Sequence, residues 1–367
     1  MAEKCEGMMT ALITPTTLDD FRQLVKYQVA YGIHGLLPCG TTGQSPTLSW
    51  NEHEALISDA VKIADKKVPV IAGAGSNNPV EGIEATKHAA DIGAYATLHV
   101  TGYYNCPSQQ GFADYFEKVA KAAPGCKVII YNIPGRGHPI IRHEVVVGLC
   151  SEFPNIIGTK DATGGKSNDH PEYKGDGSYW KALRKEAKEK GLDKHRFKII
   201  SGDDPATLKM IMDPEIEAVG AISVWSNIFP RAYSDMARLA LEGNYDEAGK
   251  IDKALADLNK VVGIKDNIGY LVQIGKNQVW VPRDTYRNPE SVQRTAYELG
   301  MISSPDLRSP MGFLFESDWV EQVGSILYKL YDGKYDIDPD YLFGPIKDFF
   351  NPEPSIDKRL WEYRPEK

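Results

Sequence analysis

One lysine in the sequence occupies a position from which its amine can act as a nucleophile. Lys160 ends the short apolar run 156–160, which predicts a buried strand. Partial loss of hydration lowers the pKa of such a lysine and exposes a neutral amine, which forms a Schiff base with a ketone. The phenols of Tyr131 and Tyr104 and the hydroxyl of Thr42 follow other apolar runs and can exchange protons with a carbinolamine oxygen. These four residues are the candidate catalytic set, although a single lysine at a strand end more often only reaches solvent.

Two further segments are suited to binding carboxylates. The turn 40–45 contains two glycines beside Thr41 and Thr42, and the exposed N–H groups of such a turn can hold a small anion. Arg136 follows a predicted strand, and its guanidinium can bind a second carboxylate through two hydrogen bonds. The alternatives are an ordinary turn between strand and helix for the first segment and a surface ion pair for the arginine.

Eight apolar runs alternate with amphipathic, helix-like stretches up to about residue 225. The runs are 8–14, 35–39, 69–75, 96–102, 127–133, 156–160, 198–202 and 218–224. This alternation predicts parallel βαβ units in an α/β protein, and eight of them favour a closed (β/α)8 TIM barrel over an open sheet. The segment 73–78 lacks the third glycine of a dinucleotide-binding turn. In a (β/α)8 barrel the active site lies at the carboxyl ends of the strands, where the candidate residues fall.

The remainder of the chain reads as helices followed by an aromatic tail. Amphipathic patterns span 227–241, 245–263, 289–300 and 317–331, and the last stretch is rich in proline and aromatic residues. We expect three parts: a barrel with the catalytic site at 1–225, a helical domain at 226–312 and an extension at 313–367. Because disordered tails are poor in aromatic residues, the extension should pack on the barrel or on a neighbouring subunit.

Composition excludes several classes of function. The formal net charge is −8, so the chain lacks the basic surface that binds nucleic acid. No apolar run approaches the roughly 20 residues that span a membrane. The five cysteines are scattered and the first residues lack the features of a secretion signal, so we expect a reducing, cytoplasmic location. No spacing of histidine, cysteine or carboxylate residues indicates a metal site.

Several of these segments together resemble the dihydrodipicolinate synthase / N-acetylneuraminate lyase family of class I, pyruvate-dependent aldolases. The matching segments are 40–54 (GTTGQSPTLSWNEHE), 70–78, 103–111 (YYNCPSQQG), 131–137 (YNIPGRG), 156–164 (IIGTKDATG), 201–204, 221–227 and 288–311. The resemblance covers about residues 8–312, so the last 55 or so residues lie outside it. It implies the barrel and the helical domain, a Schiff base between Lys160 and pyruvate, and no other cofactor.

The resemblance also implies roles for the remaining candidates. Tyr131 would be the acid/base group above Lys160, and Thr42 and Tyr104 would complete a proton relay. Tyr104 typically reaches across from a neighbouring subunit in this family, which implies a homo-oligomer, either a dimer or a homotetramer. The N–H groups of Thr41 and Thr42 would hold the pyruvate carboxylate. The carbonyl group of Ile222 would line the site.

An arginine at the position of Arg136 is typical of the family members that condense pyruvate with L-aspartate-4-semialdehyde in lysine and diaminopimelate biosynthesis. It would bind the carboxylate of that aldehyde, and the product would be 4-hydroxy-tetrahydrodipicolinate. The alternatives are a lyase of the same family acting on a 2-keto-3-deoxy sugar acid, N-acetylneuraminate or 4-hydroxy-2-oxoglutarate, and a keto-acid sensor without turnover. In each case the partners are small molecules, not nucleic acid or membrane.

The resemblance further implies a site where free lysine inhibits. The corresponding residues are Pro46, Trp50, His53, Asn77, Glu81 and Tyr103. A carboxylate, an amide and an aromatic wall suit the charged groups and the methylene chain of that ligand. Departures from the family are Gln44 in place of glutamate, Gly137 in place of threonine or serine, and a longer polar segment at 165–197 that could act as a lid, cover a substrate or contact a neighbouring subunit.

Overall fold

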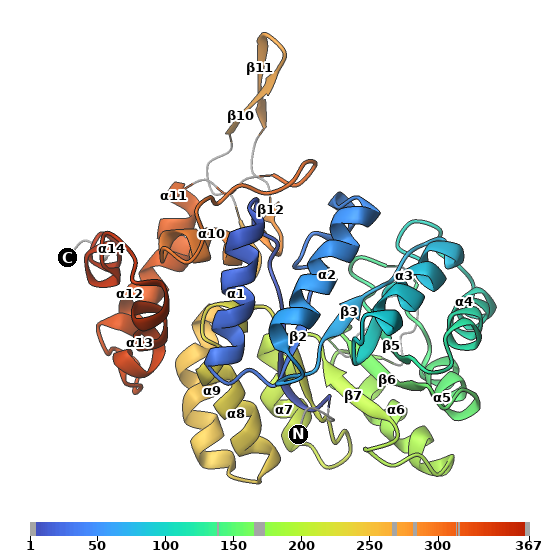
Figure 1. The fold of residues 1–367 in the computed structure, drawn as a ribbon. Coiled ribbons are helices and arrows are strands. Elements are labelled where there is room, and N and C mark those ends of the chain that lie inside the picture. The colour runs from blue at the N-terminus through green and yellow to red at the C-terminus, as the bar shows by residue number, and fades with distance from the viewer. Residues whose placement is uncertain are drawn as a thin grey trace.

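A closed barrel of eight parallel strands forms the centre of the molecule (Figure 1). The computed structural model describes residues 5–137, 139–164, 173–265, 270–281, 285–312, 314 and 316–363. The strands are β1 Gly7–Ala11, β2 Gly35–Leu37, β3 Ile71–Gly73, β4 Ala96–His99, β5 Lys127–Asn132, β6 Ile156–Asp161, β7 Lys198–Ser201 and β8 Gly220–Ser223. Their order is β2-β1-β8-β7-β6-β5-β4-β3, and a parallel bridge between Leu36 and Val70 joins the two end strands. The predicted (β/α)8 barrel is confirmed.

Helices surround the barrel and bury the outer faces of its strands. They are α1 Leu18–Ala30, α2 Trp50–Ala64, α3 Pro79–Asp91, α4 Gln109–Ala122, α5 His143–Glu152, α6 Ser178–Glu189, α7 Thr207–Met212 and α8 Pro230–Leu241. Local sequence sets their starts: Ser49 and Glu52 form a reciprocal capping box on α2, and Ser108 caps α4. One apolar cluster lies between the strands and helices, and a second, which includes Ile129 and Ile200, fills the barrel interior.

The pairing of β5 with β6 positions the candidate nucleophile. In this register Tyr131 lies opposite Lys160. On the other side of β6, a Cβ atom at Gly158 would lie 2.1 Å from the carbonyl oxygen of Lys198 in β7. Only glycine permits an approach that close, so Gly158 fixes the distance between the two strands just below Lys160.

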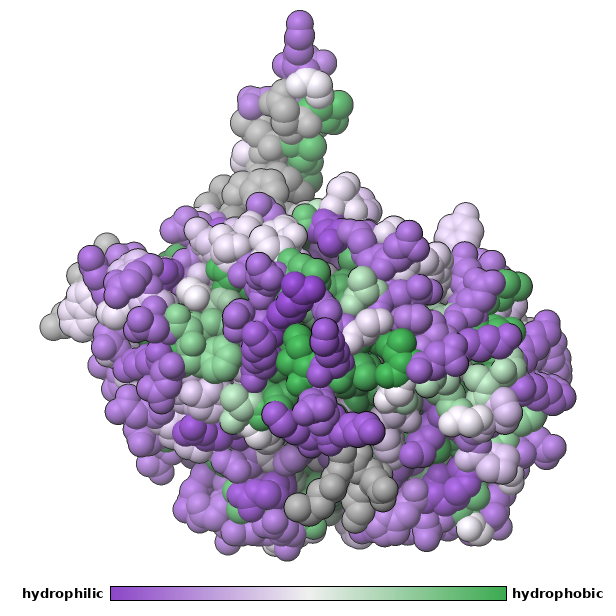
Figure 2. Space-filling view, viewed as in Figure 1, coloured by the Kyte–Doolittle hydropathy of each residue, from purple (hydrophilic) through white to green (hydrophobic). Residues whose placement is uncertain are grey.

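Two small antiparallel sheets follow α9 Tyr245–Asn259, where only helices were expected. One pairs β9 Ile264–Lys265 with β12 Thr285–Tyr286, and the other is the hairpin β10 Tyr270–Ile274 and β11 Asn277–Val281. The hairpin projects from the body of the molecule (Figures 1 and 2). Trp280 on this hairpin is exposed. Gly275, at φ 61°, provides the turn, and β-branched residues on both sides favour strands.

The chain ends in helices that pack on the rest of the same chain. These are α10 Glu290–Glu298, α11 Glu316–Trp319, a π-helical turn at Val320–Gly324, α12 Ser325–Tyr331, α13 Pro339–Phe350 and α14 Ile356–Trp361. The ring of Phe343 in α13 lies 5.2 Å from that of Phe229, and Phe350 lies 5.0 Å from Tyr27 in α1. Tyr341 donates a hydrogen bond to Asp235 in α8. Within the described ranges, no helix is both long and apolar enough to cross a membrane.

Candidate active site

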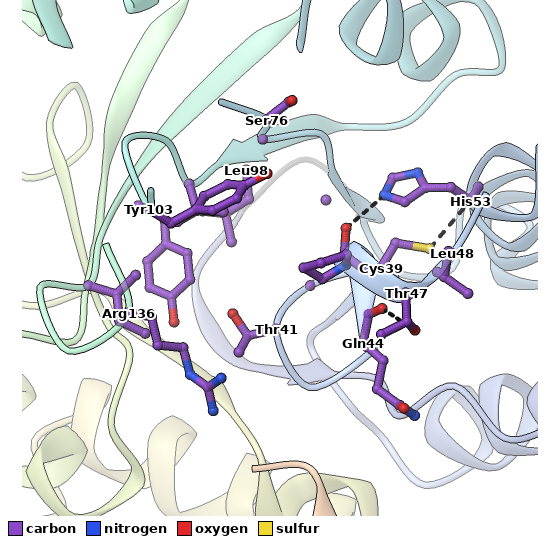
Figure 3. A pocket seen from close by; sticks show the side chains of 18 of the residues that line it. Cys39, Thr41, Gln44, Thr47, Leu48, His53, Ser76, Leu98, Tyr103 and Arg136 are labelled. Carbon is purple, nitrogen blue, oxygen red and sulfur yellow. Dashed lines mark hydrogen bonds between the residues drawn. The ribbon is translucent and has the colours of Figure 1, made fainter. Parts of the chain in front are cut away.

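A cavity of about 660 Å³ lies at the carboxyl ends of the barrel strands. Its walls come from the segments after β2, β3, β4 and β5, together with Asn288, Pro310 and Met311 from the C-terminal part of the chain. Figure 3 shows Thr41, Tyr103 and Arg136 around this space. The location agrees with the rule that sites in these barrels form at the carboxyl ends of the strands.

Lys160 lies against the ring of Tyr131 in the interior of the barrel. Its side chain is buried, with 4% exposed, and its Nζ atom is 4.3 Å from the centre of the Tyr131 ring. Burial lowers the pKa of this amine from 10.5 to about 8, although the negative charges of Asp203 and Asp204 act in the opposite direction. A substantial fraction of the amine is therefore neutral near pH 8, as a nucleophile requires.

Tyr131 is buried and keeps its proton. Burial raises the pKa of its phenol well above the usual value, and the charge of Asp203 adds to this rise. A hydrogen bond with the Thr41 side chain acts against it. Tyr131 therefore stands as a neutral phenol between Lys160 and a threonine hydroxyl, which suits a group that passes protons.

The threonine beside Tyr131 is Thr41, whereas Thr42 was expected there. Thr42 is buried, and its Oγ1 atom accepts a hydrogen bond of 2.9 Å from Nδ2 of Asn288. The two adjacent side chains make different contacts within a tight turn, in which Cys39 and Gln44 both have φ 55°. The sequence alone gives no basis for choosing between two consecutive threonines.

Tyr104 and Ile222 are not brought together with Tyr131 at the cavity wall. Tyr104 is 86% exposed and does not line the cavity of its own chain, so any part it plays in a relay requires a neighbouring copy. Ile222 is buried in β8 inside the barrel. The neighbouring Tyr103 lines the cavity, and its N–H donates to Oδ1 of Asn77.

Arg136 faces the cavity and is held by the main chain of Asn288. Its Nη2 atom donates a hydrogen bond of 2.9 Å to the Asn288 carbonyl oxygen. Burial lowers the pKa of the guanidinium, yet an arginine retains its charge in proteins. Asn288 was not among the predicted site residues, and its place 246 residues from Thr42 in the sequence left no local signal.

Most of the residues predicted for an inhibitor site line the same cavity. They are Pro46, Trp50, His53, Glu81 and Tyr103. His53 lies 3.2 Å from Ser45, and burial lowers the pKa of its imidazole to about 4, so it is neutral at pH 7. Glu81 accepts a hydrogen bond of 2.5 Å from Ser76. Tyr131, Thr41 and Arg136 line this cavity too, so the second set shares one continuous space with these three residues within a single chain.

The long segment after β6 is anchored beside the catalytic residues. Residues 165–172, part of the proposed lid, lie outside the described residues. Beyond them, Trp180 in α6 donates to Oδ1 of Asp161, the residue next to Lys160. Tyr179 accepts a hydrogen bond from Asn132, the residue next to Tyr131. The start of α6 thus holds the ends of β5 and β6. Across the described part of the chain, no cluster of three or more histidine, cysteine or carboxylate residues could hold a metal ion.

Comparison with known proteins assigns this barrel to a family. The model of the Dihydrodipicolinate synthetase family matches residues 4–298. The 4-hydroxy-tetrahydrodipicolinate synthase of Sulfurihydrogenibium sp. (strain YO3AOP1) is 35% identical over 328 residues, 88% of this chain and 97% of that protein. The corresponding synthase of Parvibaculum lavamentivorans is 39% identical over 267 residues, 71% of this chain and 84% of that one.

A solved structure shares the same architecture. The dihydrodipicolinate synthase from Cyanidioschyzon merolae, determined with lysine bound, superposes with a TM-score of 0.71 at 28% identity, covering 88% of this chain and 97% of that one. The family match, the identity to its curated members and the shared barrel agree with one another. The chain belongs to the Dihydrodipicolinate synthetase family.

Proposed function

We propose that this chain condenses pyruvate with L-aspartate-4-semialdehyde through a Schiff base on Lys160 and yields 4-hydroxy-tetrahydrodipicolinate. The observation that carries the proposal is the buried Lys160 amine, with a pKa of about 8, against the ring of a neutral Tyr131. The presence of Arg136 at the same cavity favours an aldehyde that carries a carboxylate over a neutral one. The activity named for the curated relatives supports the same substrates.

The first half of the reaction joins pyruvate to the enzyme. The neutral amine of Lys160 attacks the pyruvate ketone; the nitrogen then loses a proton and the ketone oxygen takes one, which gives a neutral carbinolamine. That hydroxyl leaves as water when it receives a second proton, and a protonated imine remains. We assign the delivery of these protons to the phenol of Tyr131 and the hydroxyl of Thr41, with Tyr104 of a neighbouring copy as the proposed connection to solvent; the hydrogen bond between Tyr131 and Thr41 supports this assignment.

The second half forms the new carbon–carbon bond. Loss of a proton from the methyl group converts the imine to an enamine, whose terminal carbon attacks the aldehyde of the second substrate. The aldehyde oxygen takes a proton to become a hydroxyl group, and the protonated imine with Lys160 forms again. The amino group of that substrate then displaces Lys160 from the imine carbon, which closes the ring and frees the amine. We assign the pyruvate carboxylate to the N–H groups of Thr41 and Thr42, and the second carboxylate to Arg136.

Trapping of the imine tests this proposal directly. Wild-type protein is incubated with pyruvate and sodium cyanoborohydride, and the modified peptide is identified by mass spectrometry. We expect a stable adduct on Lys160 and none in Lys160→Met. Turnover of L-aspartate-4-semialdehyde then distinguishes an enzyme from a keto-acid sensor. Absence of the adduct in a folded wild-type chain refutes the proposal.

Arg136→Ala identifies the second substrate class. If Arg136 binds the carboxylate of the aldehyde, the variant should form the pyruvate adduct at the normal rate and show a KM for the aldehyde raised about a hundredfold, since a bidentate charged pair is lost. A lyase for sugar acids should lose much less. Equal kinetics with the aldehyde before and after substitution contradict this assignment.

We also propose that free lysine binds in the part of the cavity lined by Trp50, Glu81 and Tyr103 and inhibits the reaction. Glu81 offers a carboxylate for an amino group, and Trp50 and Tyr103 offer aromatic walls for the methylene chain. A solved relative carries bound lysine, which supports the same ligand here. Activity measured against millimolar lysine should fall, and Glu81→Gln should remove the effect while leaving turnover in place. A flat response in the wild type contradicts this part.

A further inference from the structure

Asn288 contacts both elements to which the substrate carboxylates are assigned. Its side-chain Nδ2 donates to Oγ1 of Thr42 at 2.9 Å, and its main-chain carbonyl oxygen accepts from Nη2 of Arg136 at 2.9 Å. It also lines the cavity. One residue from the C-terminal part of the chain therefore joins the turn 40–45 to the loop that carries Arg136, in addition to the hydrogen bond between Thr41 and Tyr131 at the end of β5.

The direction of the Thr42 contact follows from the chemistry of the two groups. The nitrogen of an amide side chain only donates hydrogen bonds, whereas a hydroxyl has one proton and accepts through its lone pairs. With Nδ2 of Asn288 facing it, Thr42 accepts. The Oδ1 atom of Asn288 is buried and has no hydrogen-bond partner among the described residues.

A second contact joins the same turn to the C-terminal part. Gln44 donates through Nε2 to Oε1 of Gln293 in α10 at 3.2 Å, and it accepts from the main-chain N–H of Arg308 at 2.9 Å. The turn 40–45 is therefore attached at two points to the segment that contains Asn288. Its conformation is set by residues more than two hundred positions away in the sequence.

We propose that Asn288 is a positioning residue that fixes the turn carrying Thr41 and Thr42 relative to Arg136. The inference rests on the proposed function, because it assigns the two loops to the two carboxylates. The N–H groups of the turn must face pyruvate for attack by Lys160, and the guanidinium must face the second substrate. Asn288 holds each loop by a different atom, so substitution of its side chain separates the two effects.

Two variants of Asn288 test whether the effects on the two substrates can be separated. Asn288→Ala keeps the main-chain carbonyl that holds Arg136 and removes only the bond to Thr42. We expect the KM for pyruvate to rise and the rate of imine trapping to fall by about five- to tenfold, the worth of one buried hydrogen bond, with the KM for the aldehyde within about twofold of wild type. Asn288→Asp keeps the shape but places a negative charge beside Arg136 and both anionic substrates. Both KM values should then rise, and high salt should reduce the increase.

Matched controls exclude a general loss of structure. Asn277→Ala lies on the exposed strand β11 and should match the wild type in every measurement. Thr42→Val removes the acceptor of the same hydrogen bond, so the double variant Thr42→Val/Asn288→Ala should be no worse than either single variant. A merely structural role for Asn288 would instead give additive losses and would change both KM values in Asn288→Ala.

The outcomes distinguish a failure of this inference from a failure of the proposed function on which it rests. A wild-type chain that forms no adduct with pyruvate overturns the proposed function and this inference together. A wild-type chain that forms the adduct, with Asn288→Ala unchanged in trapping rate and in the KM for pyruvate, overturns the inference alone. If Asn288→Ala fails to fold by circular dichroism, the isosteric Asn288→Asp and Thr42→Val decide the question, and normal pyruvate KM values in both overturn the inference.

Discussion

The pH dependence of imine formation follows from the burial of Lys160. Only the neutral amine attacks pyruvate, and burial lowers its pKa from 10.5 to about 8. At pH 7 about a tenth of the amine is then neutral, which is about 300-fold more than for an ordinary lysine. The rate of trapping should rise about tenfold per pH unit up to about pH 7 and level off above pH 8.

Asp203→Asn tests the electrostatic part of this reasoning. The charge of Asp203 raises the pKa of Lys160, so its removal should lower that pKa, and loss of an opposite charge at this range is worth about one unit. At pH 7 the neutral fraction would rise from about a tenth to about half, and trapping would become about fivefold faster. A substitution in the site that accelerates the first step is an unusual outcome, and a structural defect does not produce it.

The assay follows adduct formation by intact mass with pyruvate and cyanoborohydride between pH 5.5 and 9. Asp246→Asn, which removes an exposed carboxylate on α9, is the charge-matched control and should follow the wild-type profile. A wild-type profile that still rises steeply at pH 9 would refute the lowered pKa. An Asp203→Asn profile that is unchanged or displaced to higher pH would refute the role given to the carboxylate.

Three further predictions concern stability. Gln44→Glu replaces an amide, which donates toward the Gln293 and Thr14 carbonyl oxygens, by a carboxylate that cannot donate. The free energy of unfolding in urea should fall by about 2–3 kcal/mol, and by more at pH 8 than at pH 5. Equal stability of the variant at both pH values would contradict this. Trp319→Ala removes a buried ring and should cost about 3–5 kcal/mol, visible as a lower Tm, whereas a shift of less than a degree would contradict the packing. Burial raises the pKa of Asp161 from 3.8 to about 7, so its contribution to stability should fall as pH rises through that window, and Asp161→Asn should remove this dependence in urea titrations from pH 4 to 8.

The barrel was predictable because its signal repeats. Each of the eight apolar runs is short, most are rich in β-branched residues, each is followed by a helical pattern, and all eight form parallel strands of one sheet. The carboxyl-end rule then placed Lys160 and Tyr131 near each other without knowledge of their register, and β5 and β6 pair them directly. The pattern that predicts each strand and helix lies in consecutive residues, so it can be recognised in the sequence alone.

The hairpin β10–β11 was missed although its signal was present. The strands YLVQI and NQVWV alternate branched, aromatic and amide side chains about Gly275, a pattern that favours a hairpin over a helix. The expectation of helices only after residue 224 followed the neighbouring patterns and not these residues. Trp280 and Val279 are exposed on the hairpin, whereas an amphipathic helix would have been expected to bury them on its apolar face.

Parts of the site could not be read from the sequence because they depend on contacts between distant segments. The choice between Thr41 and Thr42 is made by the turn geometry, and Asn288 fixes one of the two. Asn288 is itself placed by α10, which the C-terminal helices hold: Trp319 donates to Thr295, and Tyr363 donates to Glu298. Contacts between residues so far apart in the sequence leave no periodic pattern by which they could be predicted. The extension beyond the family match at residue 298 thus supports the helix that follows Asn288.

The chain has a net charge of −8, yet both proposed substrates are anions. The hydrogen-bond partner of Arg136 indicates how the cavity can attract them. Within the described residues it makes no ion pair and donates to the neutral carbonyl oxygen of Asn288. Arg308, by contrast, is paired with Glu52 at 2.9 Å, which neutralises it. A guanidinium held by a neutral acceptor keeps its full charge for a ligand. The same argument explains why an asparagine, and not an aspartate, suits position 288: an aspartate would hold Arg136 equally well but would cancel the one charge at the cavity that the second substrate requires.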